Sequence, residues 1–303
     1  MLTSASQIPV THLAAEIDSQ PDHWARAGAL AAEHHALLPA SGERVAVIGC
    51  GTSLFMARAY AALREQAGQG LTDAWPAGQP PAREYDRYLV ICRSGTTTEV
   101  LDAMRAFPAG APRTVITSSP GTPVLDLGDA LLIADADEQS VVQTRFATTT
   151  LAILRSHLGE DLAPVIEQAR AVLAEDPADA LAAVCGVDQI TFVGMGFAAA
   201  LAEEAALKLR ESCQAWTESY LATEYRHGPI SIAAPGRAVW ALGEVPASLA
   251  PAVTATGAHF EHRTLDPMAE LVRVHRLCVL RAADLGLDPD HPRSLSRSVV
   301  LDS

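Results

Sequence analysis

Short apolar segments that end in glycine, serine or threonine and lead into helix-like stretches constrain the fold of this chain most. Residues 45–48 run into Gly49-Cys50-Gly51-Thr52-Ser53, and residues 88–91 run into Cys92-Arg93-Ser94-Gly95-Thr96-Thr97-Thr98. Apolar segments of this length that alternate with helical patterns are typical of buried parallel strands. The pattern predicts an α/β fold in which helices flank a parallel sheet.

The same design continues along the chain. Further strands are expected at residues 114–117, 130–134, 189–193, 238–242 and 258–263. Helices are expected at residues 12–40, up to about 67 after the first glycine turn, and at 99–107, 141–158, 164–174 and 198–216. A turn at residues 175–177 precedes a second series of strands and helices. We therefore expect two domains, residues 1–160 and residues 161–303, each of ordinary domain size.

Composition excludes several classes of protein. The formal net charge of -14 argues against binding to nucleic acid and to anionic membranes. No apolar run reaches the roughly 20 residues that span a bilayer, and residues 1–10 do not form a secretory signal. The five cysteines include no CxxC pair, which indicates reduced thiols in a cytoplasmic protein. No spacing of histidine, cysteine and aspartate indicates a set of metal ligands.

Two of the glycine-rich loops carry hydroxyl groups suited to a phosphate. Gly51-Thr52-Ser53 and Ser94-Gly95-Thr96-Thr97 each follow a predicted strand. In an open parallel sheet, ligands lie beyond the carboxyl ends of the strands, where glycine admits close approach and helix N-termini attract anions. Helix capping also selects serine and threonine, so either loop alone is ambiguous. Two such loops in consecutive strand–helix units favour phosphate binding.

The chain has one lysine, Lys208, against 21 arginines. Glu204, Lys208 and Glu211 are spaced to share one face of a predicted helix that is otherwise apolar. They form either a solvated salt-bridge stripe or a carboxylate base beside an amine, since buried charges must be paired or used. His227 follows in a turn that Gly228 and Pro229 make rigid.

A second glycine motif favours a different cofactor. Gly194-Met195-Gly196-Phe197-Ala198-Ala199 matches the G-x-G-x-x-A dinucleotide fingerprint. That fingerprint expects a second strand about 20 residues later that ends in an acidic residue. Here a helix passes Glu211 and a polar loop leads to His227, so we predict no cofactor and keep a nicotinamide enzyme as a third alternative.

In order along the chain, these motifs resemble those of the sugar isomerase (SIS) family, specifically the isomerase half of glucosamine-6-phosphate synthase and its stand-alone relatives. The matching residues are Glu16-Ile17, Gln20-Pro21, Cys50-Gly51-Thr52-Ser53, Ser94-Gly95 with Thr97, residues 146–151, Ala206-Leu207-Lys208-Leu209 with Glu211, His227-Gly228-Pro229, Asp288, Asp290, Pro292-Arg293 and Leu295. The resemblance implies two tandem SIS domains, each a five-stranded parallel sheet between helices in a flavodoxin-like three-layer αβα arrangement. It also implies an N-terminal helix on the first domain and a C-terminal tail over the active site.

The chemistry implied by the resemblance is interconversion of an aldose and a 2-ketose through a cis-enediol or enolamine. Glu211 is then the base that moves a proton between C1 and C2, and Lys208 places the sugar and tunes Glu211. His227 is the ring-opening acid/base that reaches a neighbouring subunit, which implies a homodimer with shared active sites. The implied sugar-phosphate contacts are Gly51, Thr52, Ser53, Cys92, Arg93, Ser94, Gly95, Thr97, Gln143 and Arg297.

The chain departs from the family pattern in three ways. Arg297 stands where the synthase has its Schiff-base lysine, and a guanidinium cannot form that imine. Cys92 and Gln143 replace two hydroxyl residues, although Arg93 adds a cationic donor. The chain begins Met1-Leu2, without the glutaminase half and its N-terminal cysteine. The prediction is therefore an isomerase or deaminase for aminosugar phosphates of the hexose 6-phosphate class. The alternative is a non-catalytic sugar-phosphate-binding module or regulator.

Overall fold

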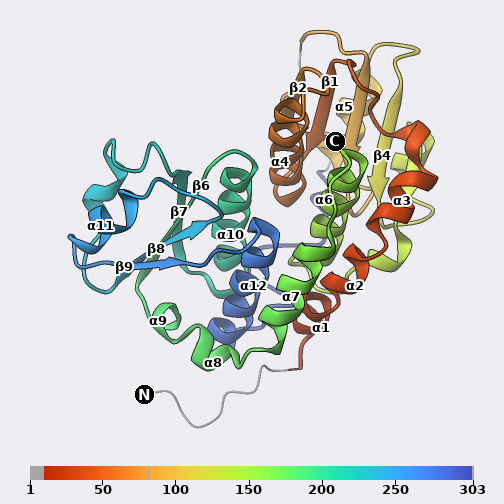
Figure 1. The fold of residues 1–303 in the computed structure, drawn as a ribbon. Helices are drawn as coiled ribbons and strands as arrows, with labels where there is room; N and C mark the ends of the chain where they lie inside the picture. The colour runs from red at the N-terminus through yellow and green to blue at the C-terminus, as the bar shows by residue number, and fades with distance from the viewer. Residues whose placement is uncertain (1–9, 81, 302–303) are drawn as a thin grey trace. The chain divides into compact units, whose positions relative to one another are not determined.

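A computed structural model describes residues 10–80 and 82–301 of the chain. The described residues form two compact units, each with its own parallel sheet and flanking helices (Figure 1). The predicted α/β class is thereby confirmed. The five-strand unit contains the described residues of Asp22–Glu138, Arg145–Leu162 and Ser296–Ser303, and the four-strand unit those of Met1–Pro21, Gln139–Thr144 and Ala163–Leu295. Unlike the contiguous halves 1–160 and 161–303 expected from the sequence, the two units interleave along the chain.

The sheet of the five-strand unit is parallel throughout and has the order β2-β1-β3-β4-β5. Its strands are β1 (Val45–Gly49), β2 (Thr72–Pro76), β3 (Arg87–Ile91), β4 (Arg113–Thr117) and β5 (Asp129–Leu132). Its helices are α3 (Ala27–Glu33), α4 (Thr52–Gln66), α5 (Thr98–Ala106) and α6 (Arg145–His157), with α2 (Gln20–Trp24) and the short 3-10 turns η1 (His35–Leu37), η2 (Pro123–Asp126) and η3 (Ala134–Ala136). The order turns back between β1 and β3, so right-handed crossovers place α4 and α5 on opposite faces of the sheet.

Apolar packing explains why these elements form. Every residue of β1 is buried, as expected for a central strand with helices on both faces. Val100 and Met104 of α5 belong to a core cluster with Ile48 and Val90 of the sheet. On the other side, Trp24 donates from Nε1 to Thr148 Oγ1 at 3.0 Å, which joins α2 to α6.

The sheet of the four-strand unit is also parallel and has the order β7-β6-β8-β9. Its strands are β6 (Gln189–Gly194), β7 (Trp216–Leu221), β8 (Arg237–Leu242) and β9 (His259–His262). Its helices are α1 (His12–Asp18), α7 (Ala163–Ala174), α8 (Pro177–Ala180), α9 (Ala182–Cys185), α10 (Phe197–Cys213), α11 (Leu249–Thr254) and α12 (Pro267–Asp284), with the 3-10 turn η4 (Pro229–Ile232). The resemblance implied five strands, and the described residues of this unit form four.

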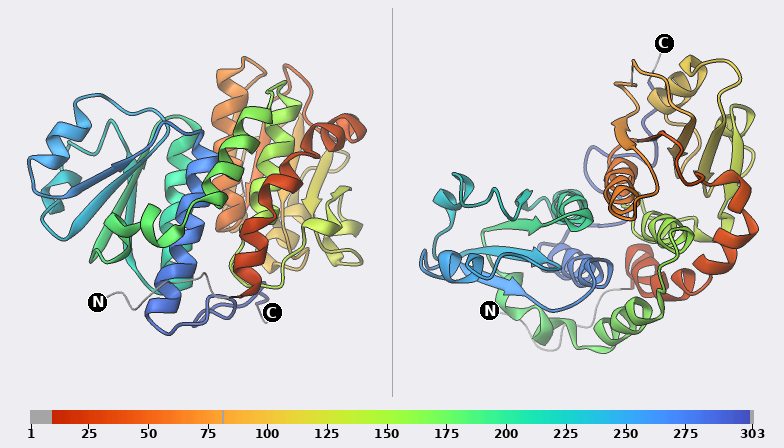
Figure 2. Two further views of the ribbon diagram at one scale, coloured as in Figure 1. Left: turned by 60° about the horizontal axis from the view of Figure 1, so that its bottom comes forward. Right: turned by 45° about the horizontal axis from the view of Figure 1, so that its top comes forward.

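Helix α12 lies beside α10 on one face of this sheet (Figure 2). A buried polar cluster holds it there: Trp240 Nε1 donates to Glu270 Oε1 at 2.6 Å, and Arg273 pairs with both Glu270 and Glu261. The guanidinium of Arg273 also lies 4.9 Å from the centre of the Trp240 ring. Glu261, Glu270 and Arg273 therefore each have a partner of opposite sign, which offsets the cost of burying their charges.

Two carboxylates attach helix α1 to segments that are distant from it in the sequence. Asp290 caps α1, because its two oxygens accept the backbone N–H groups of His12 and Leu13 at 2.8 and 2.7 Å. Glu16 of α1 accepts the N–H of Gln139 at 2.6 Å and that of Ser140 at 3.3 Å. These bonds explain why residues near both ends of the chain, and the short segment 139–144, belong to one unit.

Several expected elements differ from the structure. The single helix predicted over residues 12–40 is instead a series of short helices. The predicted helix 198–216 ends at Cys213, where Gln214 adopts a left-handed conformation with φ 54°, and strand β7 follows. The edge strands β2 and β7 are only partly buried, so their sequences lack the continuous apolar run of a central strand. Helix α12 was not expected, and no helix in the described part of the chain is long and apolar enough to cross a membrane.

Candidate functional site

The carboxyl ends of β1 and β3 form the point where the five-strand sheet reverses its order. Loops at such a point separate, because the chain leaves the two strands toward opposite faces of the sheet. The two hydroxyl-rich loops predicted to bind phosphate, Gly51-Thr52-Ser53 and Cys92 to Thr97, follow these two strands. The structure therefore brings both loops to one edge of one sheet.

The loop after β1 needs glycine at two places. A Cβ on Gly49 would lie 2.6 Å from the backbone carbonyl carbon of Ser53, so a side chain there would force the loop open. Gly51 has φ 54° and ψ -126°, a conformation that L side chains rarely adopt. The chain can then turn at once into α4, where Thr52 and Ser53 are buried in the first turn.

Arg93, in the loop after β3, is buried and paired. Its guanidinium lies 3.2 Å from Glu138 Oε2, and the two side chains are only 2% and 0% exposed. Glu138 also accepts the backbone N–H of Arg145 at 2.7 Å. The positive charge of Arg93 is therefore balanced within the unit, and the ion pair joins the loop after β3 to the start of α6.

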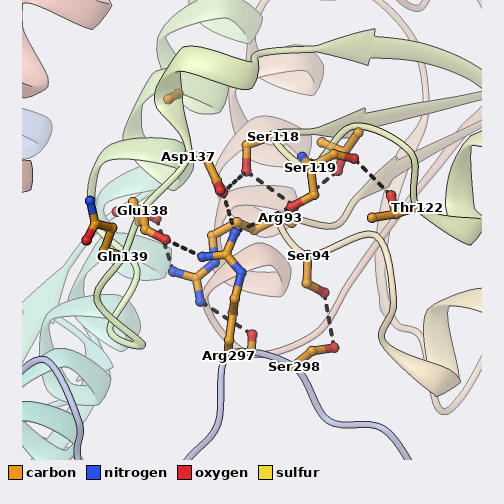
Figure 3. Close-up of polar contacts among 12 residues, drawn as sticks. Arg93, Ser94, Ser118, Ser119, Thr122, Asp137, Glu138, Gln139, Arg297 and Ser298 are labelled. Carbon is orange, nitrogen blue, oxygen red and sulfur yellow. Dashed lines mark hydrogen bonds and ion pairs between the residues drawn. The ribbon is translucent and has the colours of Figure 1, made fainter.

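Four hydroxyl groups gather beside Arg93, and one comes from the C-terminal segment. Ser298 Oγ lies 3.1 Å from Ser94 Oγ, 3.0 Å from Thr96 Oγ1 and 3.3 Å from Thr97 Oγ1. Figure 3 shows the Ser94–Ser298 contact together with the arginines on the same edge of the sheet. The buried thiol of Cys92 lies 4.0 Å from Ser94 Oγ and 3.9 Å from Thr97 Oγ1. We call Ser94, Thr96, Thr97 and Ser298 the hydroxyl cluster.

Gly95 fixes the shape of this loop. Its φ is +65°, and a Cβ there would lie 2.0 Å from Thr122 Oγ1. Its carbonyl accepts the N–H of Val124 at 3.2 Å. Only glycine satisfies both the conformation and the close contact, so the predicted importance of this position has a structural cause.

Arg297 is held by groups on the same unit (Figure 3). Its guanidinium pairs with the carboxylate of Asp137 and donates to the carbonyl of Glu138, with Ser119 Oγ at 3.4 Å. Asp137 also accepts the hydroxyl of Ser118 at 2.7 Å. The charge of Arg297, like that of Arg93, is thus matched by an adjacent carboxylate.

The four-strand unit holds the predicted acid–base residues on α10. Lys208 Nζ lies 2.5 Å from Glu211 Oε2 and 3.4 Å from Glu204 Oε1. Lys208 and Glu204 are each 1% exposed, whereas the side chain of Glu211 is 18% exposed. One ammonium therefore sits between two carboxylates, and Glu211 is the member of this trio that solvent or a ligand can reach.

His275 of α12 lies beside this trio and was missed by sequence reasoning. Gln20 Nε2 donates to the carbonyl of Ile17 at 3.1 Å and lies 3.3 Å from His275 Nδ1. Burial and, to a smaller extent, the positive charge of Lys208 lower the pKa of His275 to about 3. The imidazole is therefore neutral, with Nδ1 as the acceptor and the ring hydrogen on Nε2.

Two further predicted site residues are His227 and Gln143. His227 is exposed in the turn after β7, where its N–H donates to the carbonyl of Glu224 at 2.9 Å. None of the described contacts joins it to Glu211. Gln143 belongs to the four-strand unit, whereas Ser94 and Arg93 belong to the other, and its Oε1 atom is buried without a hydrogen-bond partner among residues 10–80 and 82–301.

The dinucleotide-like motif occupies the equivalent strand end in the four-strand unit. A Cβ on Gly194 would lie 2.4 Å from the carbonyl oxygen of Ala198, and Gly196 has φ 55°. The sequence predicted a polar loop after α10. That prediction was wrong for residues 217–221, because they belong to strand β7. That strand ends at Leu221, which is not acidic. Among the residues that the structure describes, no three histidine, cysteine, aspartate or glutamate side chains gather to hold a metal.

The sequence was compared with those of known proteins. No family model matches the chain. The chain is 26% identical to a glutamine–fructose-6-phosphate aminotransferase of Symbiobacterium thermophilum, over 91% of this chain and 54% of that protein. The corresponding protein of Methanothermobacter thermautotrophicus is also 26% identical, over 86% of this chain and 52% of the relative. The chain thus spans about half the length of the curated relatives it matches.

Solved structures share the fold at low sequence identity. The glucosamine-6-phosphate deaminase of Thermotoga maritima aligns with a TM-score of 0.75 at 22% identity, over 96% of this chain and 100% of that one. The tagatose-6-phosphate ketose/aldose isomerase of Escherichia coli aligns with a TM-score of 0.76 at 18% identity, over 97% and 100%. The class is that of α/β proteins whose parallel sheets are flanked by helices, as in phosphosugar isomerases. Within it, the resemblance to the sugar isomerase family is confirmed, and the curated relatives named above are isomerizing glutamine–fructose-6-phosphate aminotransferases.

Proposed function

We propose that this protein is an aldose–ketose isomerase or deaminase for aminosugar phosphates of the hexose 6-phosphate class. We further propose that its two units are a tandem pair of SIS domains in a cytoplasmic homodimer. The observation that carries the proposal is the trio on α10, in which Glu211 is partly exposed while Lys208 and Glu204 are buried.

Glu211 has the properties of a proton-shuttling base. A carboxylate within reach of C1 and C2 can take a proton from one carbon and return it to the other, through a cis-enediol or an enolamine. Lys208, 2.5 Å away, fixes the position of Glu211, and Glu204 holds Lys208 from the other side. A helix surface of this kind places the base more precisely than a mobile loop does.

The hydroxyl-rich loops provide the anchor for a phosphate. Ser53, Ser94 and Thr97 follow adjacent strands, and helix N-terminal amides lie beside them. Because Glu138 balances the charge of Arg93, neutral donors are the main phosphate ligands in this proposal.

The presence of Arg297 in place of the family's imine-forming lysine is compatible with an amino substrate. Such a substrate already carries its nitrogen, so no lysine is needed to form an imine. Open-chain glucosamine 6-phosphate gives up its C2 proton to Glu211, and the enolamine takes a proton at C1. Water then adds to the resulting C2 imine, and ammonia leaves to give the 2-ketose.

His227 is proposed as the ring-opening acid/base of a neighbouring subunit. It is exposed, and no described contact joins it to Glu211. Dimers that combine a Glu211→Gln subunit with a His227→Ala subunit should recover about a quarter to a half of the activity of the parent, because one intact site forms. Activity no higher than in either homodimeric variant would exclude this role for His227.

The test of the proposed function is turnover. Ammonia release and ketose formation are measured with glucosamine 6-phosphate and fructosamine 6-phosphate. Glu211→Gln should lower kcat by about 10²–10⁴-fold, the usual contribution of a general base. Glu167→Gln is the matched control, because this carboxylate lies on the surface of α7 in an exposed pair with Arg170. Equal rates for wild type and Glu211→Gln would show that Glu211 is not the base.

A non-catalytic sugar-phosphate-binding module is the second candidate. It is favoured by one observation, the pairing of Arg297 with Asp137 at the position of the family's imine-forming lysine. In that case hexose 6-phosphates raise the thermal unfolding temperature, yet none of them is turned over. Turnover that depends on Glu211 would exclude this candidate.

A further inference from the structure

The C-terminal segment 296–301, which we call the tail, is bound to the loop after β3 and the start of α5. Thr98 donates its backbone N–H to the carbonyl of Val299 at 3.2 Å, and Leu301 donates its N–H to Thr98 Oγ1 at 2.9 Å. Arg93 Nη2 donates to the carbonyl of Arg297 at 3.4 Å. Three bonds that involve the tail backbone therefore set its register, with Ser298 in the middle.

The tail delivers the hydroxyl of Ser298 to the predicted phosphate loop. Ser94 and Thr96 donate their hydroxyl hydrogens to Ser298 Oγ, at 3.1 and 3.0 Å. Two donors occupy the lone pairs of this oxygen, so its own hydrogen remains to be given to Thr97 or to a ligand. Ser298 is thus oriented as a donor by the loop itself.

Ser298 also lies where the loop lacks one of the hydroxyl groups of the family pattern. Cys92 carries a thiol, a weak donor, where the family pattern has a hydroxyl. Its sulfur lies 4.0 Å from Ser94 Oγ and 3.9 Å from Thr97 Oγ1, the same two hydroxyls that Ser298 contacts. The tail therefore adds a hydroxyl beside the thiol that replaces one.

An ion pair next to Ser298 holds the tail in place. Arg297 pairs with Asp137, and Asp137 is fixed in turn by the hydroxyl of Ser118 at 2.7 Å. The partners are only partly exposed, 36% for Arg297 and 39% for Asp137. In this chain the arginine thus contacts a carboxylate of its own unit, and the adjacent serine reaches the hydroxyl cluster.

We propose that Ser298 is a phosphate-binding residue supplied by the tail, and that the Arg297–Asp137 pair is its positioning device. This inference rests on the proposed function, because it concerns the same anion site. It assigns to the tail a binding role that is separate from imine chemistry: Ser298 touches the phosphate, and Asp137 acts only through the tail.

The experiment is titration of the full chain with inorganic phosphate in an isothermal calorimeter. Ser298→Ala should raise the Kd for phosphate about tenfold, as expected for losing one hydrogen bond to a charged group. Ser298→Thr keeps the hydroxyl and should stay within about threefold of wild type. Ser41→Ala is the matched control, because Ser41 is exposed in the turn before β1, outside the tail and the hydroxyl cluster, and the Kd of this variant should equal that of wild type.

The positioning role has its own readout. Asp137→Asn should also raise the Kd, and the double variant Asp137→Asn with Ser298→Ala should bind no more weakly than Ser298→Ala alone, because both changes act on one hydroxyl. Additive losses would show that Asp137 acts independently of Ser298 and would overturn the positioning claim. Circular dichroism and thermal unfolding without phosphate identify any variant that is misfolded, and Ser298→Thr then carries the comparison.

The outcomes separate this inference from the proposed function. A Ser298→Ala variant that binds phosphate as well as wild type, or more tightly, overturns the inference, because Ser298 would then merely occupy the place of a ligand oxygen. A wild type that binds no phosphate overturns the inference and the phosphate site together. The expected series of Kd values in a protein that turns over no sugar phosphate supports the tail's role and rejects the proposed enzyme.

Discussion

The sheet of the five-strand unit turns back between β1 and β3, and the sheet of the four-strand unit turns back between β6 and β8. At this point both units use a strand, a G-x-G turn and a helix, and the backbone is nearly the same. Gly51 has φ 54° and ψ -126°, and Gly196 has φ 55° and ψ -131°. What differs is where each unit carries its polar side chains.

In the five-strand unit the polar groups gather at the strand ends, whereas in the other they lie along a helix. A partly exposed hydroxyl costs little folding free energy, so a loop of serine and threonine can remain accessible to an anion. A charged trio must be enclosed to change its acid–base behaviour, and the α10–α12 interface encloses Lys208 and Glu204. The same scaffold thus carries neutral hydroxyls at the strand ends of one unit and a charged trio along a helix of the other.

The largest effect should come from breaking the buried charges of each unit. Lys208→Met leaves the carboxylates of Glu204 and Glu211 without their ammonium, and should lower the free energy of unfolding by about 3–5 kcal/mol. Glu138→Gln, which removes the carboxylate paired with Arg93, should cost a similar amount. Chemical denaturation measures both. Arg170→Met breaks an exposed pair and should change stability by less than about 1 kcal/mol.

Equal unfolding of wild type and Lys208→Met would contradict the enclosed trio. A large loss for Glu138→Gln with none for Lys208→Met would break the comparison between the units, because only one of them would then depend on a buried ion pair.

The next effect is a pH dependence that arises from His275 in the four-strand unit. The pKa of His275 is about 3 in the folded protein, whereas an unburied histidine has a pKa of 6.5. Between these values the unfolded chain binds more protons than the folded one. The free energy of unfolding therefore falls as pH drops below 6.5, by at most about 1.4 kcal/mol per pH unit from this group.

His275→Gln should flatten that decline when urea denaturation is measured at pH 7, 6 and 5. His291→Gln is the control, since that imidazole is 75% exposed. If the slopes of wild type and His275→Gln coincide, the imidazole is not enclosed beside the trio.

The smallest effect should test the shared backbone. Neither Gly51 nor Gly196 has any atom within 4 Å of the position of an added Cβ, so alanine at either place meets only the strain of its conformation. Each substitution should lower the free energy of unfolding by about 1–2 kcal/mol, and the loss should be the same in both units. Denaturation midpoints compare the two. Costs that differ by more than about 1 kcal/mol would show that the turns are not equivalent.

The central strands and their loops could be predicted from the sequence because their signals are local. Val45 to Gly49 is a continuous apolar run with a glycine turn, and Glu211 follows Lys208 at helical spacing. The edge strand β7 could not be recognised, since Trp216 and Leu221 are exposed and its pattern is mixed.

Long-range pairings were beyond the sequence for a different reason. Arg297 could be recognised as a departure from the family, but its partner Asp137 lies 160 positions away, and only the folded chain brings the two together. His275 is likewise ordinary in the sequence. Its place beside Lys208 depends on the packing of α12 against α10.

The interleaving of the two units has a consequence for how the protein is made. The five-strand sheet is synthesised first, but it lacks α6 until residue 157 is made and lacks its tail until residues 296–301 are made. The second sheet must recruit a helix that was translated long before it. Neither unit can be cut out as a contiguous fragment without losing a piece, so co-translational folding of the five-strand unit is completed only after residues 296–301 have been synthesised.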